Sequence, residues 1–206
     1  MPAGARPPLA PRSDHALADA RFPRSSRYDP EWVFENQMGP NALWLTEWLA
    51  GAMALEPGMR VLDMGAGRAI SSVFLAAEYG VEVWANDLWI GATDNWGRIR
   101  AAGMEGKVHP IHAEAHDLPY AEGFFDAILS MDSYQYYGTD DLYLRPFSAT
   151  CSQFSCTTPI SMSRPYASAA SAENFAHVPS TRVSSCVSPR LRCTWARSRY
   201  ALSSPT

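Results

Sequence analysis

Polar and glycine residues follow four short apolar segments of this chain, where each segment would end as a β-strand. In the first group Asp63 precedes the turn Gly65-Ala66-Gly67. Glycine lets the backbone approach a ligand closely because it has no Cβ, and the N-terminus of a following helix attracts an anion. An acid before such a turn disfavours a pyrophosphate and favours an ammonium. The first group therefore predicts a ligand that carries both an ammonium and a carboxylate.

Asp87 ends the second apolar segment, and an acid at this strand end typically accepts hydrogen bonds from ribose hydroxyls. The alternative is an ordinary solvated turn residue. The third group is a polar turn over residues 112–119, in which Glu114 and the backbone of Ala115 have the donor and acceptor groups to bind an adenine edge. The fourth is a buried segment that ends at Ser130, Met131 and Asp132 and opens into a loop rich in tyrosine.

Apolar runs and helical spacing predict the elements that position these groups. We expect helices and strands to alternate in the manner of βαβ units, with a parallel sheet and right-handed crossovers that place helices on its faces. Ligands then bind beyond the carboxyl ends of the strands. The expected helices cover residues 41–53, 69–79 and 93–102, and the expected strands cover 60–64, 81–86, 107–112 and 124–130.

Composition narrows the class of protein. The chain has 206 residues, 47% of them hydrophobic, and a net charge of −4. It has no basic surface for nucleic acid or an anionic membrane, and no apolar run long enough for a membrane span or a signal peptide. We expect a cytoplasmic protein. The cysteines lack the spacing of a zinc site, so no metal is expected.

The two ends of the chain differ in composition from its middle. Residues 1–27 are rich in Pro, Ala and Arg without periodicity, and we expect a disordered leader. Residues 28–146 have the composition of a folded domain. Residues 147–206 lack glycine, are rich in Ser, Thr and Arg, and hold all four cysteines. We interpret them as a disordered or frameshifted tail, and a natural disordered extension is the alternative.

The four groups together, in this order and spacing, resemble motifs I to IV of class I S-adenosylmethionine-dependent methyltransferases. The similarity is to the small-molecule subgroup labelled "type 11" or "cyclopropane-synthase-like", and residues 28–41 resemble leader segments of its bacterial members. The resemblance implies a Rossmann-like α/β fold with a parallel sheet, S-adenosyl-L-methionine as cofactor, and a small-molecule methyl acceptor. It covers a little over half of the chain.

The resemblance also implies roles for individual residues. The methionine moiety would lie against the first group, and Asp87 would bind the ribose. Adenine would contact Glu114 and Ala115, Leu88 would pack on the adenine or the ribose, and the sulfonium would lie near Ser130 and Met131. The candidates for a general base toward the acceptor are Asp132, His112, His116 and Tyr134. The residues expected around the methionine moiety are Asp63, Gly65, Ala66 and Gly67.

The chain departs from the family in two ways. Ala69 stands where the last glycine of motif I is common, and nothing after Leu144 resembles the last three of the family's seven strands. We therefore expect only four strands, an open sheet edge that favours association, poor stability and impaired activity. Two alternatives remain: a non-catalytic remnant of the cofactor fold, and a nicotinamide-dependent oxidoreductase.

Overall fold

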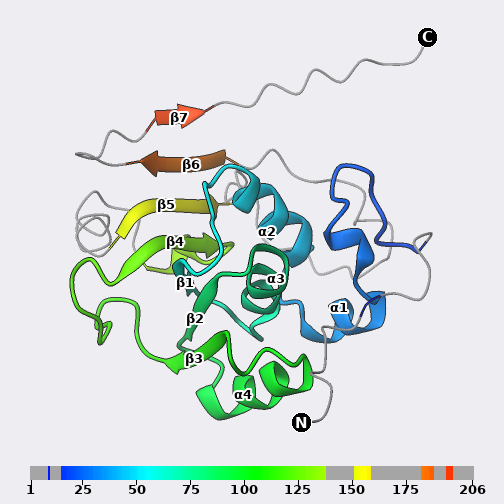
Figure 1. Ribbon diagram of the computed structural model, residues 1–206, viewed down its shortest axis with the longest axis horizontal. Helices are drawn as coiled ribbons and strands as arrows, with labels where there is room; N and C mark the ends of the chain where they lie inside the picture. The colour runs from blue at the N-terminus through cyan, green and yellow to red at the C-terminus, as the bar shows by residue number, and fades with distance from the viewer. Residues whose placement is uncertain (1–8, 10–14, 138–150, 159–181, 188–193, 197–206) are drawn as a thin grey trace, which may run out of the picture.

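The computed structural model describes residue 9, residues 15–137 and three later strands, 151–158, 182–187 and 194–196 (Figure 1). Short 3-10 helices lie at Ser25–Arg27 and Tyr134–Tyr136. None of the helices in this described part is long and apolar enough to cross a membrane. The α-helices are α1 (Pro30–Asn36), α2 (Ala42–Gly51), α3 (Ile70–Tyr79) and α4 (Ala92–Ala101). The strands are β1 (Arg60–Met64), β2 (Glu82–Asp87), β3 (Val108–His112), β4 (Phe125–Met131), β5 (Cys151–Thr158), β6 (Arg182–Val187) and β7 (Thr194–Ala196).

The strands form one sheet in the order β3-β2-β1-β4-β5-β6-β7. Pairing from β3 through to β5 is parallel, while β6 pairs antiparallel with β5, and β7 pairs antiparallel with β6. The predicted parallel α/β sheet is confirmed, and the first four strands begin and end within one residue of their predicted bounds. The chain order reverses between β1 and β4, and ligands bind at such a point in open α/β sheets.

The sheet does not end at β4, so the expectation of four strands with an open edge there is wrong. Strand β5 pairs with β4 in parallel, from Phe125 opposite Cys151 to Met131 opposite Thr157. A β-ladder uses backbone N–H and C=O groups, so the unusual composition of this region does not prevent pairing. The described parts of the 147–206 tail are β5, β6 and β7, and its other residues lie outside the described part.

Local signals explain how the first helices begin and end. The Asn41 side chain accepts a hydrogen bond of 3.1 Å from the backbone N–H of Trp44 and caps α2. Helix α3 ends at Gly80, whose φ of +70° suits a residue without a Cβ. Helix α1, which we did not predict, begins at Pro30 after the N-cap Asp29.

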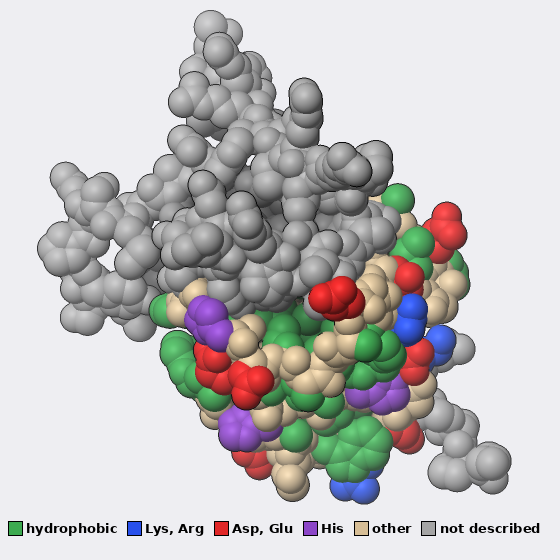
Figure 2. Space-filling view, turned by 90° about the vertical axis from the view of Figure 1, so that its left-hand side faces the viewer, with side chains coloured by type: hydrophobic (Ala, Val, Ile, Leu, Met, Phe, Trp, Pro, Cys, Tyr) green, Lys and Arg blue, Asp and Glu red, His purple; other side chains and the backbone are tan. Residues whose placement is uncertain are grey.

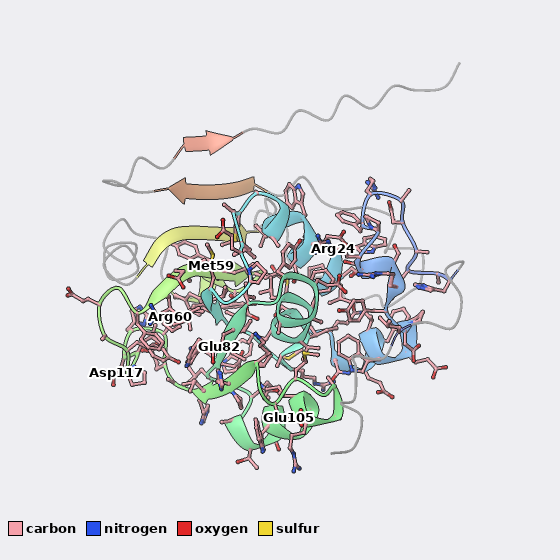
Figure 3. All side chains as sticks on the ribbon, in the orientation of Figure 1. Arg24, Met59, Arg60, Glu82, Glu105 and Asp117 are labelled. Atoms are coloured by element: carbon pink, nitrogen blue, oxygen red, sulfur yellow. The ribbon has the colours of Figure 1, made fainter. Side chains whose placement is uncertain are left out.

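The core lies on both faces of the sheet. On one face, Val61, Val83 and Leu129 pack with residues of α2, α3 and α4 in the largest buried cluster. On the other face, Leu62 and Ile128 pack with an aromatic group that includes Trp84, Phe124, Phe125 and Tyr120. In the part of the chain described up to residue 137, no α-helix contributes to this second cluster, although Tyr134 of the second 3-10 helix does. The loop between β3 and β4, with Asp117 at its outer end, contributes its side chains instead (Figure 3).

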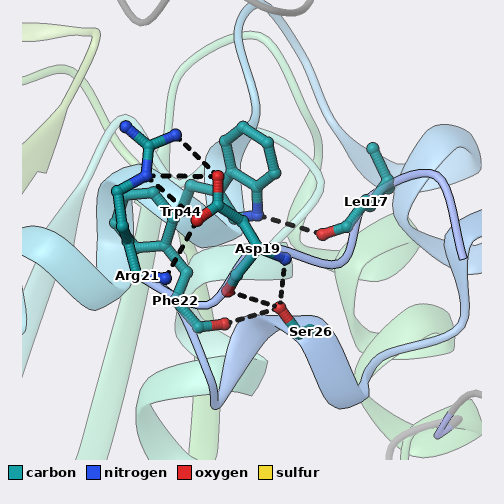
Figure 4. Close-up of polar contacts among 6 residues, drawn as sticks. All are labelled: Leu17, Asp19, Arg21, Phe22, Ser26 and Trp44. Carbon is teal, nitrogen blue, oxygen red and sulfur yellow. Dashed lines mark hydrogen bonds and ion pairs between the residues drawn. The ribbon is translucent and has the colours of Figure 1, made fainter. Parts of the chain in front are cut away.

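The N-terminal segment is ordered from residue 15 onward, so the expected disordered leader is wrong for residues 15–27. Leu17 is buried in a cluster with Tyr28, Leu43 and Phe74. The Trp44 indole donates a hydrogen bond of 3.2 Å to the backbone O of Leu17 (Figure 4). Burial of apolar side chains against α2 and α3 offsets the ordering entropy, although the segment lacks sequence periodicity. Residues 1–8 and 10–14 lie outside the described part.

Glu47 on α2 anchors this N-terminal segment. One carboxylate oxygen of Glu47 accepts hydrogen bonds from the backbone N–H and the hydroxyl of Ser25, at 2.8 and 2.7 Å, and the other accepts from the N–H of Arg24 at 3.1 Å. Arg24 also donates to the backbone O of Glu78 and lies over the ring of Tyr79. These contacts hold the N-terminal segment in place before the chain enters α1. From α1 the chain continues to the carboxyl edge of the sheet, which we call the ligand edge because ligands bind at this edge in open α/β sheets.

Candidate functional site

The predicted glycine turn connects β1 to α3 at the carboxyl edge of the sheet. Gly65 and Gly67 have φ values of +70° and +55°, a region that favours glycine. The N–H groups of Gly65 and Ala66 both donate to the backbone O of Asn86, at 2.9 and 3.0 Å. Ala69, the N-cap of α3, has a φ of +60° and makes no side-chain capping bond. The first turn of α3 therefore directs its N–H groups toward this edge without a side-chain cap.

Asp87 ends β2 beside the turn and is 8% exposed. Its Oδ2 accepts a hydrogen bond of 2.8 Å from the N–H of Gly67. Its Oδ1 accepts from the N–H groups of Trp89 and Ile90, at 2.7 and 2.8 Å. The carboxylate thus fixes two loops, one after β1 and one after β2, and it is not a solvated turn residue.

Asp63, in β1 before the turn, is buried. It is 1% exposed, and its Oδ2 accepts hydrogen bonds of 2.6 Å from the hydroxyls of both Ser71 and Ser72 at the start of α3. Burial raises the pKa of Asp63 to about 6, against the lowering effect of the two serine hydroxyls. Its Oδ1 is buried with no hydrogen-bond partner in the described part of the chain.

The β3 end brings together the predicted adenine-binding residues and two of the proposed bases. Glu114 is exposed, and its carboxylate accepts hydrogen bonds of 2.8 Å from the N–H and the ring of His116. These bonds lower the pKa of Glu114. The His112 ring contacts the backbone O of Leu88 at 2.8 Å, and Ala115 packs in the aromatic cluster of the second face.

Figure 2 shows acidic and histidine side chains side by side on one face of the molecule, with few Lys or Arg side chains among them. Two contacts of this kind join His109 to Glu82 at 2.9 Å and His116 to Glu114 at 2.8 Å. His116 thus has a partner within its own loop, whereas His112 contacts Leu88 of the loop after β2. This arrangement favours a structural role for these two rings.

The β4 end carries a chain of hydroxyl contacts that reaches the glycine turn. The Ser130 and Ser133 hydroxyl oxygens are 2.8 Å apart, and Ser133 donates to the backbone O of Met64 at 2.7 Å. Met131 turns toward α2, where its Sδ accepts a hydrogen bond of 3.1 Å from the Thr46 hydroxyl. The loop after β4 is therefore tied to the end of β1.

Asp132 and Tyr134 follow β4 directly. Asp132 has a φ of +50°, which is uncommon for a residue other than glycine and is found most often at functional sites and tight turns. Tyr134 is 8% exposed and packs with Leu62 and Ile128, so most of its ring belongs to the core. Of the two, Asp132 is the residue placed at the ligand edge.

The loop between α1 and α2 also reaches the site, and sequence reasoning missed it. A Cβ placed on Gly67 would lie 3.2 Å from the Sδ of Met38, and one placed on Gly39 would lie 3.0 Å from an oxygen of Asp132. The Arg68 side chain donates to the backbone O of Glu35 and holds this loop against the turn. A short glycine-containing link between two helices, Met38-Gly39, was the available signal.

The structure thus brings the predicted cofactor residues to one edge of the sheet, where Asp63 is buried against the start of α3 and Met131 contacts Thr46 of α2. The order reversal between β1 and β4 and the glycine turn lie at the same edge.

Comparisons with known proteins agree with this geometry. Residues 61–151 match the family model described as a methyltransferase domain. The chain is 33% identical over 91 residues to the glycine/sarcosine/dimethylglycine N-methyltransferase of Actinopolyspora halophila, a match that covers 44% of this chain and 16% of that protein. It is 35% identical over 91 residues to the demethylmenaquinone methyltransferase of Mycobacterium sp. (strain KMS), covering 44% and 36%. The match thus spans less than half the length of either relative.

The fold is also similar to that of solved structures. A SAM-dependent methyltransferase from Aquifex aeolicus aligns with a TM-score of 0.54 and 18% identity, over 69% of this chain and 79% of that one. At this identity the similarity concerns the fold. It supports the Rossmann-like arrangement of the first strands and helices that the sequence predicts.

Proposed function

We propose, from the match of residues 61–151 to the family model described as a methyltransferase domain, that this chain is a class I methyltransferase that binds S-adenosyl-L-methionine for methyl transfer to a small-molecule acceptor. The observation that carries the proposal is the junction of the glycine turn with Asp87. There a carboxylate, a turn of positive φ and an uncapped helix start meet at the point where the strand order reverses. The cofactor supplies an activated methyl group when bound.

The donor set fits the cofactor. The start of α3 offers N–H groups to a carboxylate, and the unpartnered Oδ1 of Asp63, which is buried next to the same turn, favours an ammonium. Asp87 lies where ribose hydroxyls would meet its oxygens. Leu88, at 51% exposure, presents an apolar face to adenine. The residues that we propose for the cofactor are Asp63, Gly65, Ala66, Gly67, Asp87, Leu88, Glu114, Ala115, Ser130 and Met131.

The protein contributes alignment and proton handling to such a transfer. A base is needed only when the acceptor loses a proton, as a hydroxyl or an amine does. Among the four proposed bases, Asp132 has the best position, because it follows β4 and lies beside Gly39 of the covering loop. His112, His116 and Tyr134 have contacts that favour structural roles. We therefore propose Asp132 as the base.

The acceptor is proposed as a small molecule because the two relatives above are named for glycine derivatives and for demethylmenaquinone. Activity below that of intact family members is expected, since the region after Leu144 does not resemble theirs. The second candidate is a remnant of the fold that binds cofactor without turnover. The lack of resemblance after Leu144 favours this candidate as well. The nicotinamide alternative has no comparable support.

A methyl-transfer assay separates the two candidates. The full chain is incubated with cofactor labelled in its methyl group and with a panel of small amines, thiols and quinols. Transfer of the label to one acceptor, with formation of S-adenosylhomocysteine, that is lost in Asp132→Asn supports methyl transfer. Cofactor binding without release for any acceptor would favour the remnant.

A further inference from the structure

Two large aromatic side chains are exposed at the ligand edge of the sheet. Trp89 is 69% exposed and Tyr136 is 65% exposed, yet their rings contact each other with centroids 5.4 Å apart at an interplanar angle of 60°. Large apolar side chains exposed together at one place usually mark a binding surface. Met38 and Leu88, at 43% and 51% exposure, lie at the same edge.

The contact between the two rings spans the end of β1. Trp89 follows β2 and Tyr136 follows β4, and β1 lies between these two strands in the sheet. All three strands run parallel, so their carboxyl ends share one edge. The pair therefore crosses above the place where the chain leaves β1 for the glycine turn.

The backbone N–H groups of Trp89 and Tyr136 both donate hydrogen bonds to residues of the candidate site. The N–H of Trp89 donates to Oδ1 of Asp87 at 2.7 Å, and the N–H of Tyr136 donates to the backbone O of Ser133 at 3.0 Å. The next residue, Tyr137, lies against the turn, because a Cβ on Gly65 would be 2.3 Å from its hydroxyl oxygen. The pair thus joins the ribose end of the proposed site to its methionine end.

The chemistry of the cofactor places its sulfonium between these two ends, because the sulfur joins the ribose to the methionine chain. We propose that Trp89 and Tyr136 form an aromatic clamp that contacts this sulfonium and selects the charged cofactor over S-adenosylhomocysteine, its neutral thioether product. The inference rests on the proposed function. Aromatic faces attract cations, and an uncharged thioether loses that attraction.

The surrounding charges act in the same direction. Asp63 and Asp87 lie at the same edge, and Asp132 follows the neighbouring strand. Carboxylates beside a cation stabilise it through space even when hydrogen bonds to the protein engage their oxygens. A cation–π contact of ordinary strength corresponds to a preference of about 2- to 30-fold.

The test compares the dissociation constants of S-adenosylmethionine and S-adenosylhomocysteine by calorimetry on the full chain. Trp89→Leu and Tyr136→Leu keep an apolar side chain and remove the aromatic face. Trp96→Leu is the matched control, because Trp96 is another exposed indole, at 38%, on α4. Thermal unfolding confirms that each variant folds.

We expect the wild-type preference for the charged ligand to fall by about 2- to 30-fold in Trp89→Leu, with Tyr136→Leu in the same direction and Trp96→Leu unchanged. Equal weakening of both ligands in Trp89→Leu, or no change in either, would overturn the clamp and leave the proposed function intact. A folded wild-type chain that binds neither ligand would overturn both.

Discussion

Asp87 and Gly67 are joined by a hydrogen bond of 2.8 Å from the glycine N–H to the carboxylate Oδ2. This bond ties the end of β2 to the turn that follows β1. Asp87 also receives two N–H groups from its own loop, so one buried carboxylate sets the relative position of both ligand loops.

Asp87→Asn replaces one of the two carboxylate oxygens by an NH₂ group. That group would then face one or two backbone N–H donors in place of an acceptor. We expect Asp87→Asn to lower the free energy of unfolding by about 1–3 kcal/mol, because a buried donor loses its acceptor. Cofactor affinity should fall on the order of tenfold. Urea denaturation and calorimetry measure the two effects. Asp117→Asn, on the exposed loop between β3 and β4, should change neither quantity.

Gly65 has no room for a side chain. A Cβ there would lie 2.3 Å from the Tyr137 hydroxyl oxygen and 2.4 Å from the Cβ of Ser133, at a φ of +70°. We expect Gly65→Ala to destabilise the chain by about 1–3 kcal/mol and to weaken cofactor binding.

The control for Gly65→Ala is Gly97→Ala. Gly97 is exposed within α4, and a Cβ there would meet nothing within 4 Å. This substitution should raise the free energy of unfolding by about 0.5–1 kcal/mol, since alanine is the better helix former. Equal effects of the two substitutions in thermal unfolding would contradict the close packing at Gly65.

Asp63 makes stability depend on pH. Its pKa is raised from 3.8 to about 6, mainly by burial, so the folded state holds a proton more tightly than the unfolded state. The free energy of unfolding should therefore fall as pH rises from about 4 to about 6, by about 3 kcal/mol in total from this group.

Asp63→Asn isolates this contribution, because an amide has no charge to desolvate and still reaches the hydroxyls of Ser71 and Ser72. Denaturation curves across this pH window should show a smaller decline in stability for the variant than for the wild-type chain. Parallel pH profiles for the two proteins would show that the raised pKa is assigned to the wrong group.

Glu47 is expected to hold the N-terminal segment in place. Glu47→Ala would leave the backbone N–H groups of Arg24 and Ser25 without their acceptor, at a cost of about 1–3 kcal/mol, while the Ser25 hydroxyl keeps the backbone O of Leu43. Limited proteolysis should then cut within residues 15–27 sooner than in the wild type. Glu105→Ala, at an exposed position after α4, serves as the comparison (Figure 3). Equal resistance of the two variants would exclude Glu47 as the anchor.

The sequence predicts the first four strands well because each is a short apolar run between turn residues. Residues that are close in sequence determine this pattern, so no knowledge of tertiary contacts is needed. The bounds of β1 agree at both ends. Helix α1 was not predicted, although Asp29-Pro30 is a typical pair of N-cap and first helical residue.

Tertiary contacts decide what the sequence does not predict. The direction of the Asp63 carboxylate depends on Ser71 and Ser72 lying above it, and the approach of Met38 to Gly67 depends on how α1 and α2 pack. Strand β5 forms through backbone pairing with β4, which side-chain composition did not indicate.

The most direct test of the central claim is calorimetric titration of the full chain with S-adenosylmethionine and, separately, with a nicotinamide dinucleotide. We predict saturable one-site binding of S-adenosylmethionine, weakened in Asp87→Asn, and no binding of the dinucleotide. Binding of the dinucleotide alone, or of neither ligand to a folded chain, would contradict the account of this edge as an S-adenosylmethionine site.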